Sequence, residues 1–172
     1  MTALIRIDRS WPGEQGREKE RPIRFCSRCG HPSEDPPGRA GRFLRDRICR
    51  RCEMGLMLTC SREALPGTAA AFLVVTYELS VSAVSEAGEK IFGGEQTLIG
   101  KPLLEVLTSP LGDDHLARYL GHAAQRDCPP TVLPVRLVAD SGRVGTMAAR
   151  IATCGPPRAA LVTVEPSEFG RR

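Results

Sequence analysis

Residues 71–107 read AFLVVTYELSVSAVSEAGEKIFGGEQTLIGKPLLEVL, and the rest of the chain is organised around this segment. Two short apolar runs, 71–77 and 81–85, are typical of strands joined by a turn. A helix is predicted over 86–92, with Ser85 as its N-cap. A serine hydroxyl suits this position because it readily accepts a hydrogen bond from the free N–H groups at the start of a helix. The stretch therefore predicts a strand hairpin that leads into a helix.

The remaining residues complete the same sheet. A longer helix is expected over residues 113–127, where apolar side chains recur at helical spacing: Leu116, Tyr119 and Leu120. Three strand candidates follow it, separated by turns at Ser141-Gly142 and Gly155-Pro156-Pro157: residues 131–140, 144–154 and 159–165. An order of two strands, helices and three strands is typical of the α+β class, with an antiparallel sheet and helices on one face.

Four short motifs in this part of the chain share a pattern with a known family: FLVV at 72–75, VSAVSEA at 81–87, Ile91-Phe92-Gly93, and LIGKPL at 98–103. With them, residues 65–166 resemble a PAS domain. Gly93 and Gly100 stand where the family usually has glycines, whereas Ser85 and Gly94 depart from its usual Asn or Asp and its usual aromatic residue. The resemblance implies a five-stranded antiparallel sheet with helices on one face, in a module that senses a small molecule or dimerises.

Two pairs of cysteines dominate the first third of the chain. Cys26 and Cys29 form one C-x-x-C, Cys49 and Cys52 form a second, and nineteen residues separate the pairs. Each pair can close a tight turn around one metal ion. Two pairs complete a tetrahedral shell of four thiolates, which is the arrangement preferred by structural zinc. We therefore predict a structural Zn²⁺ site made by these four side chains.

The composition of this part also favours a bound metal. Between Pro12 and Arg47 the large apolar residues are Ile23, Phe25, Phe43 and Leu44. So few cannot offset an ordering cost of about 1–2 kcal/mol per residue, whereas a zinc site supplies on the order of 10–16 kcal/mol of apparent binding free energy. Residues 23–60 resemble a treble-clef or zinc-ribbon finger, with a hairpin arm at 42–48 and a short helical turn beginning near Cys52.

Two other side chains could enter the metal shell. His31 and Cys60 lie close to the pairs in the sequence, but four cysteines already complete a tetrahedron, and Cys60 is expected to pack as a small apolar residue. A redox role for the C-x-x-C pairs fits less well, because neither follows a strand of a βαβ pattern. Asp127 adjoins Cys128 and disfavours a thiolate there, and no basic residue adjoins Cys154, so neither is expected to be a nucleophile.

These observations divide the chain into five segments. They are a charged arm, a four-cysteine finger, a short connecting helix, a PAS-like domain and a tail, with the limits 1–22, 23–60, 61–69, 70–166 and 167–172. The connecting helix is expected to be capped by Ser61. The arm carries almost nothing to bury apart from Trp11, so we expect it to be flexible.

The net charge of +4 is distributed unevenly. The chain carries 14 Lys and Arg against 8 Asp and Glu up to Arg62, and 10 against 12 after it. Nine arginines lie between Arg21 and Arg51, so the finger could contact phosphate groups. Aromatic side chains that could stack on bases are limited there to Phe25 and Phe43. Nucleic-acid binding therefore stays an alternative to a protein partner.

The resemblance to PAS domains also bears on cofactors. Flavin-photosensing members carry a reactive cysteine after a glycine, but here Gly100 is followed by KPLLEVL. Haem-binding members use a histidine on the long helix, where His115 and His122 both lie. A histidine on such a helix is more often exposed or hydrogen-bonded, so haem and flavin are both disfavoured.

No familiar set of catalytic residues is present, since the sequence contains no G-x-x-x-x-G-K-[ST], G-x-S-x-G or H-E-x-x-H motif. No signal pattern opens the chain, and no apolar run approaches the roughly 20 residues of a membrane-spanning helix. We predict a cytoplasmic, non-enzymatic regulatory protein that forms a homodimer, binds a protein partner through its finger and does not bind membranes. The alternative is a transcription-associated protein whose finger binds nucleic acid.

Overall fold

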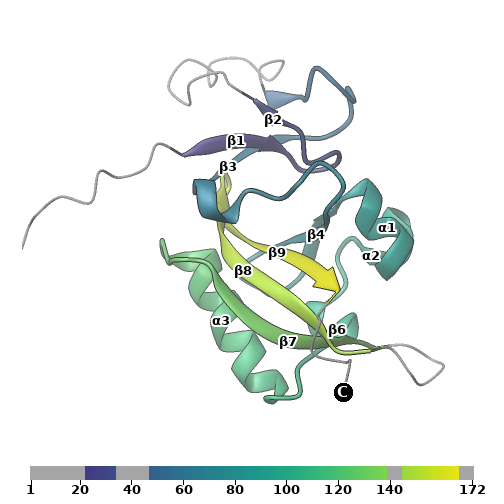
Figure 1. The fold of residues 1–172 in the computed structure, drawn as a ribbon, viewed down its shortest axis with the longest axis vertical. Coiled ribbons are helices and arrows are strands. Elements are labelled where there is room, and N and C mark those ends of the chain that lie inside the picture. Colours follow the sequence, from purple (N-terminus) through teal and green to yellow (C-terminus); the bar gives the residue numbers. More distant parts are fainter. Residues whose placement is uncertain (1–21, 34–46, 139–144, 167–172) are drawn as a thin grey trace, which may run out of the picture.

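The fold is α+β, with one antiparallel sheet and few helices (Figure 1). The computed structural model describes residues 22–33, 47–138 and 145–166. The strands are β1 (Ile23–Cys26), β2 (Pro32–Ser33), β3 (Met57–Cys60), β4 (Ala71–Val75), β5 (Val81–Val84), β6 (Leu107–Thr108), β7 (Thr131–Leu137), β8 (Met147–Gly155) and β9 (Ala159–Pro166). The helices and 3-10 turns are η2 (Arg62–Ala64), α1 (Glu86–Phe92), α2 (Glu95–Leu98), η3 (Leu103–Glu105) and α3 (Asp113–Gln125).

The five strands expected of the C-terminal part are all present in this sheet. β4 pairs with β5 on one side and β9 on the other, and β8 lies between β9 and β7. Leu73 of β4, for example, has Val84 of β5 and Val162 of β9 as its neighbours. The short strand β6 pairs with β7. The α+β class and the antiparallel sheet are therefore confirmed.

The same sheet continues into the four-cysteine part of the chain. β1 pairs with β2 and β3, and β3 pairs with the end of β8, where Cys60 lies opposite Cys154. The strand order is β2-β1-β3-β8-β9-β4-β5, and β7 pairs with the first part of β8. The nine residues of β8 are thus enough to pair with β7 at its start and β3 at its end. The finger is an extension of the main sheet.

Local sequence explains why α1 begins at Glu86. The Ser85 hydroxyl accepts a hydrogen bond from the N–H of Gly88 at 3.0 Å, as a capping side chain does. The same hydroxyl accepts from the N–H of Phe72 at 2.9 Å and donates to the Ala70 carbonyl at 3.1 Å, which connects the helix start to β4. The predicted helix and its cap are confirmed.

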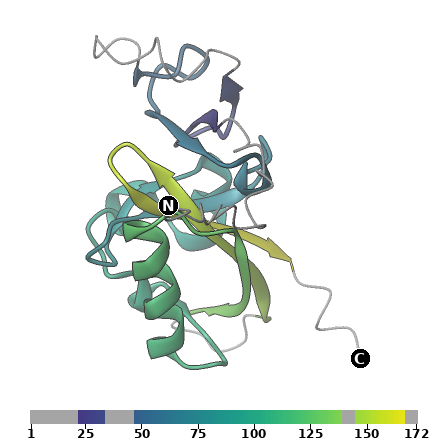
Figure 2. The same cartoon turned by 90° about the vertical axis from the view of Figure 1, so that its left-hand side faces the viewer.

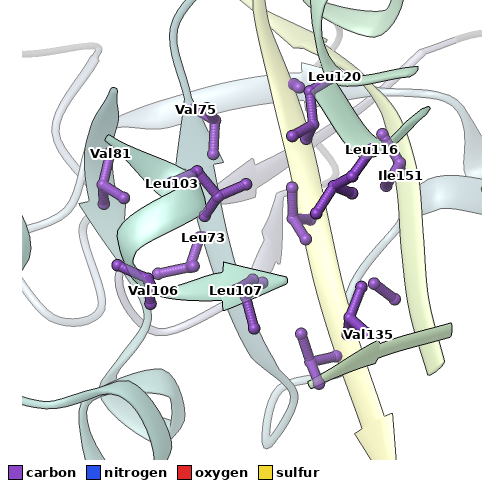
Figure 3. Packing of buried hydrophobic residues seen from close by; sticks show 14 of the residues in the cluster. Leu73, Val75, Val81, Leu103, Val106, Leu107, Leu116, Leu120, Val135 and Ile151 are labelled. Carbon is purple, nitrogen blue, oxygen red and sulfur yellow. The ribbon is translucent and has the colours of Figure 1, made fainter. Parts of the chain in front are cut away.

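The main hydrophobic core lies on the face of the sheet that the helices cover. Side chains of β4, β8 and β9 meet those of η3 and α3 there, as Figure 3 shows for Leu73, Ile151, Leu103, Leu116 and Leu120. Each of these five residues is at most 1% exposed. Figure 2 shows α3, in green, running beside the sheet. The helices and this face of the sheet therefore enclose one aliphatic interior.

A second core lies on the opposite face, because neighbouring residues of a strand point to opposite sides. There Phe72 and Leu161 of the main sheet pack with Phe25, Leu58 and other residues of the finger. The rings of Phe25 and Phe72 meet edge to face, with centroids 5.9 Å apart. The finger therefore buries its apolar side chains against the main sheet.

Three local predictions are wrong. The residues after Cys52 form a loop and then strand β3 instead of a helical turn, because pairing with both β1 and β8 satisfies their backbone groups. Ser61 precedes η2, but its side chain makes no capping hydrogen bond in this single turn. The predicted apolar face of the long helix includes Tyr119, but this side chain is 37% exposed. The buried positions of α3 are Leu116, Leu120, Ala123 and Ala124.

Some predicted segments lie outside the described residues. These are the arm up to residue 21, most of the hairpin arm at 42–48, the turn at Ser141-Gly142 and the tail at 167–172. The limits of the predicted domains stay predictions. Among the helices that the structure describes, none combines the length and the apolar character needed to cross a bilayer.

Candidate metal centre

Two turns of the finger bring the sulfur atoms of four cysteines close together. The Sγ atoms of Cys26, Cys29, Cys49 and Cys52 are all within 4.8 Å of one another. The Cys26 and Cys52 sulfurs are 3.5 Å apart, and those of Cys29 and Cys49 are 3.9 Å apart. Sulfurs bound to zinc at about 2.3 Å in a tetrahedron are about 3.8 Å apart. The spacing of the four sulfurs therefore fits one tetrahedrally coordinated ion.

The first turn follows β1 and is shaped by hydrogen bonds to sulfur. The Cys26 Sγ atom accepts hydrogen bonds from the backbone N–H groups of Arg28 and Cys29, each at 3.4 Å. The N–H of Gly30 donates to the Cys26 carbonyl at 3.0 Å. Gly30 has a φ of 68°, a conformation that favours glycine, and a Cβ there would lie 3.0 Å from the Gly67 carbonyl oxygen. The C-x-x-C-G sequence therefore suits this turn.

The second turn is held at its base by an isolated bridge between Ile48 and Leu56. Inside the bridge, the N–H of Cys49 donates to the Gly55 carbonyl at 2.8 Å, and the N–H of Glu53 donates to the Cys49 carbonyl at 2.9 Å. These bonds fold residues 49–55 back on themselves. The two cysteines of this turn consequently face the first turn.

Gly55 is a residue of the site that the sequence analysis missed. Its N–H donates to the Cys52 Sγ atom at 3.4 Å. A Cβ at this position would lie 2.3 Å from the Cys26 Sγ atom and 2.9 Å from the Arg28 Cβ atom. No side chain fits there without moving the thiols, so Gly55 allows the two turns to approach. A glycine shortly after the second cysteine pair is the only sequence signal for this role.

Burial and hydrogen bonding shift the pKa values of three of these thiols in different directions. Burial raises the pKa of Cys26 far above the ordinary thiol range, and burial also raises the pKa of Cys29. At Cys52 burial acts to raise the pKa, but the N–H groups of Met54 and Gly55 and the neighbouring thiols lower it to about 7. Cys52 therefore ionises more readily than Cys26 and Cys29, and a divalent cation held there would favour ionisation of those two thiols.

Neither alternative ligand is part of the thiol cluster. His31 has its Nδ1 atom 2.9 Å from a guanidinium nitrogen of Arg51. Cys60 is buried in the second core, as predicted, opposite Cys154. Burial raises the pKa of Cys60 to about 12, and burial together with the Cys60 charge raises that of Cys154 to about 12. Both are neutral thiols that act as small apolar side chains.

The two histidines of α3 lie away from the main core. His122 is exposed, and His115 is partly exposed, with its Nδ1 atom 3.3 Å from a guanidinium nitrogen of Arg118. The helix turns Leu116 and Leu120 toward the sheet instead (Figure 3). The geometry therefore gives no support to haem ligation by either histidine.

The comparisons with known proteins find similarity among solved structures but not among family models or curated proteins. No protein-family model matches the chain, and no curated protein matches it. Among solved structures, the PAS domain of nitrogen regulation protein NR(II) from Vibrio parahaemolyticus is similar, with a TM-score of 0.46 and 16% sequence identity. The similarity covers 60% of this chain and 94% of that one. A similarity of this size indicates neither a ligand nor a partner for this chain.

Proposed function

We propose that the chain is a non-enzymatic regulatory protein in which a zinc-ordered finger contacts a protein partner and the PAS-like domain senses a small molecule or dimerises. The observation that carries this proposal is the gathering of four Sγ atoms within 4.8 Å. Four thiolates form the shell that structural zinc prefers and leave no open position for a substrate. The role of the ion would be to hold the two turns in their folded geometry.

The surface of the second turn supports a protein partner. Ile48, Met54 and Leu56 are 43%, 69% and 51% exposed, and Ile48 and Leu56 lie opposite each other in the bridge. Arg50 and Arg51, between the two cysteines, are exposed as well. Apolar side chains beside guanidinium groups suit a partner segment that carries apolar and acidic residues. We propose that this surface, defined by these five residues, contacts the partner.

Nucleic-acid binding is the second candidate, and the exposed Arg50 and Arg51 are the observation in its favour. Of the two aromatic residues predicted for base stacking, Phe25 is fully buried against Phe72, and Phe43 lies outside the described residues. Contacts to phosphate alone would give binding that weakens steeply with salt. The affinity of a protein interface with an apolar centre would change much less with salt.

The metal content and the oligomeric state of the protein both test the proposed function. Metal analysis and native mass spectrometry of the purified protein should find one zinc ion per chain, and the Co²⁺ form should absorb as a four-thiolate complex. A zinc-free protein with an unchanged fold would refute the structural role of the metal. Native mass spectrometry also tests the predicted homodimer, because a strictly monomeric protein at micromolar concentration would contradict it.

A capture experiment separates the two kinds of partner. Exchanging Ile48, Met54 and Leu56 for serine should abolish capture of a protein partner, whereas exchanging Arg50 and Arg51 for serine should reduce it only in part. The reverse order of effects, together with steep loss of binding between low and moderate salt, would favour nucleic acid. Zinc content should stay the same in both variants, since none of these residues is in the thiol cluster.

A further inference from the structure

Arg28 connects the thiol cluster to the helices of the PAS-like domain. It lies between Cys26 and Cys29, and its backbone N–H donates to the Cys26 Sγ atom at 3.4 Å. Its guanidinium group reaches in the other direction, with one nitrogen 2.7 Å from a Glu95 carboxylate oxygen and the other 3.6 Å from a Glu89 oxygen. One residue thus contacts a candidate metal ligand, α1 and α2.

A backbone contact runs beside these ion pairs. The Arg28 carbonyl accepts the N–H of Glu86, in the first turn of α1, at 2.9 Å. The Glu89 carboxylate, which faces Arg28, also accepts the N–H of Glu95 at the start of α2, at 3.1 Å. The two short helices therefore bond to each other and to the first turn of the finger through the same group of residues.

The position of Arg28 depends on both turns of the finger. Gly55 of the second turn lies close to Arg28, because a Cβ added at Gly55 would come within 2.9 Å of the Arg28 Cβ atom. The side chains of Arg28 and Glu89 are only 22% and 27% exposed, so their ion pair is partly shielded from water. If the two turns separate, the first turn loses the packing that fixes Arg28.

The helices that Arg28 contacts form one wall of the main core. Leu98 of α2 is 3% exposed and belongs to the main core cluster, and Phe92 of α1 packs against that cluster. Each helix is short, seven residues in α1 and four in α2, so neither is stable without its neighbours. A change in their contacts with Arg28 therefore reaches the interior of the PAS-like domain.

We propose that metal occupancy of the thiol cluster controls the order of α1 and α2 through Arg28. This inference rests on the proposed metal site and goes beyond its structural role, because it makes the ion an effector of the PAS-like domain. Coupling between two sites is reciprocal. A ligand or partner that displaces α1 and α2 must accordingly weaken the binding of the metal.

Hydrogen exchange of the full-length, zinc-loaded protein tests the proposal. Removal of the ion by a chelator should speed the exchange of amides in residues 86–98, with a much smaller change in α3 at residues 113–125, which packs on β8 and β9. In Arg28→Met, which keeps the aliphatic part of the side chain, residues 86–98 should exchange faster even with zinc bound, and the chelator should add little. Glu95→Gln, which removes the negative charge that pairs with Arg28, should also speed exchange at residues 86–98 with zinc bound.

Arg51→Met is the matched control, because Arg51 lies at the corresponding place in the second turn and pairs with His31 instead of a helix. It should respond to the chelator as the unchanged protein does. By the reciprocal effect, zinc binding to Arg28→Met, measured by chelator competition, should be about two- to tenfold weaker.

Three results would overturn the inference: no change at residues 86–98 on metal removal, an equal change at 113–125, or a full response in Arg28→Met. Native mass spectrometry of the same samples reports bound zinc independently. A protein that binds zinc but shows one of these results loses only the coupling, whereas a protein that binds no zinc loses the metal site and the coupling together.

Discussion

The finger and the PAS-like domain share one sheet but are stabilised in different ways. The domain has an aliphatic core between its sheet and its helices, in which Leu73, Leu116 and Ile151 are at most 1% exposed. Around the thiols of the finger, the buried cluster consists of the cysteines and Met57. The comparison leads to the expectation that burial alone orders the domain, whereas the two turns of the finger depend on the proposed metal ion.

The two regions are in direct contact along their boundary. Phe25 of the finger packs against Phe72 of the domain, and β3 pairs with β8. Loss of the ion should therefore release the two turns first and leave β1 and β3 attached to the sheet.

Cys49→Ser should have the largest effect, and it should be confined to the finger. Loss of one thiolate removes a ligand from a site that supplies on the order of 10 kcal/mol of apparent binding free energy. We expect loss of stoichiometric zinc and rapid proteolysis within residues 47–56. Cys128→Ser is the control, because Cys128 lies near Thr153 and outside the cluster. Tight zinc binding in Cys49→Ser would contradict the four-thiol site.

Leu116→Ala should affect mainly the domain. Truncation of a fully buried leucine costs about 2–5 kcal/mol of unfolding free energy. Urea unfolding of the zinc-loaded protein followed by circular dichroism measures this loss. His122→Ala, on the exposed side of the same helix, should change the free energy by less than about 0.5 kcal/mol. Equal losses in the two variants would show that the core is placed wrongly.

Gly55→Ala should weaken the metal site with little effect on the domain. The added methyl group would lie 2.3 Å from the Cys26 Sγ atom, and forcing such an overlap costs about 1–3 kcal/mol. That cost corresponds to roughly a five- to 150-fold loss of zinc affinity, measured by chelator competition. Gly67→Ala is the control, since an added Cβ there has no atom within 4 Å. An unchanged affinity in Gly55→Ala would mean that the turns do not approach as described.

Ser85→Ala should have the smallest effect, and it tests the start of α1. The change removes a buried hydroxyl that accepts from Phe72 and Gly88, and loss of a helix cap typically costs about 1 kcal/mol and up to about 2 kcal/mol. Thermal unfolding of the zinc-loaded protein measures it. Ser82→Ala, at an exposed site in β5, should cost less. A melting temperature equal to that of the unchanged protein would refute the role of the cap.

Local patterns in the sequence predicted most of the secondary structure. The apolar run in 71–77, the cap at Ser85 and the spacing of the cysteine pairs each depend on residues close together in the chain. The structure bears out these strands and this helix and places the four thiols together, while their metal stays a prediction.

The features that were missed depend on residues distant in the chain. Residues 57–60 are too few to show a strand period, and their pairing with β8 crosses almost a hundred residues. Arg28 is one of nine arginines in its segment, and nothing near it in the sequence indicates contacts with Glu89 and Glu95. Contacts of this kind follow from tertiary packing and have no local signature.

Hydrogen exchange of the finger before and after metal removal is the most direct test of the contrast between the two regions. We predict that amides of residues 26–30 and 49–55 lose their protection when zinc is chelated, while those of β9 keep theirs. Continued protection of residues 26–30 and 49–55 in the metal-free protein would contradict the claim that an ion orders the finger.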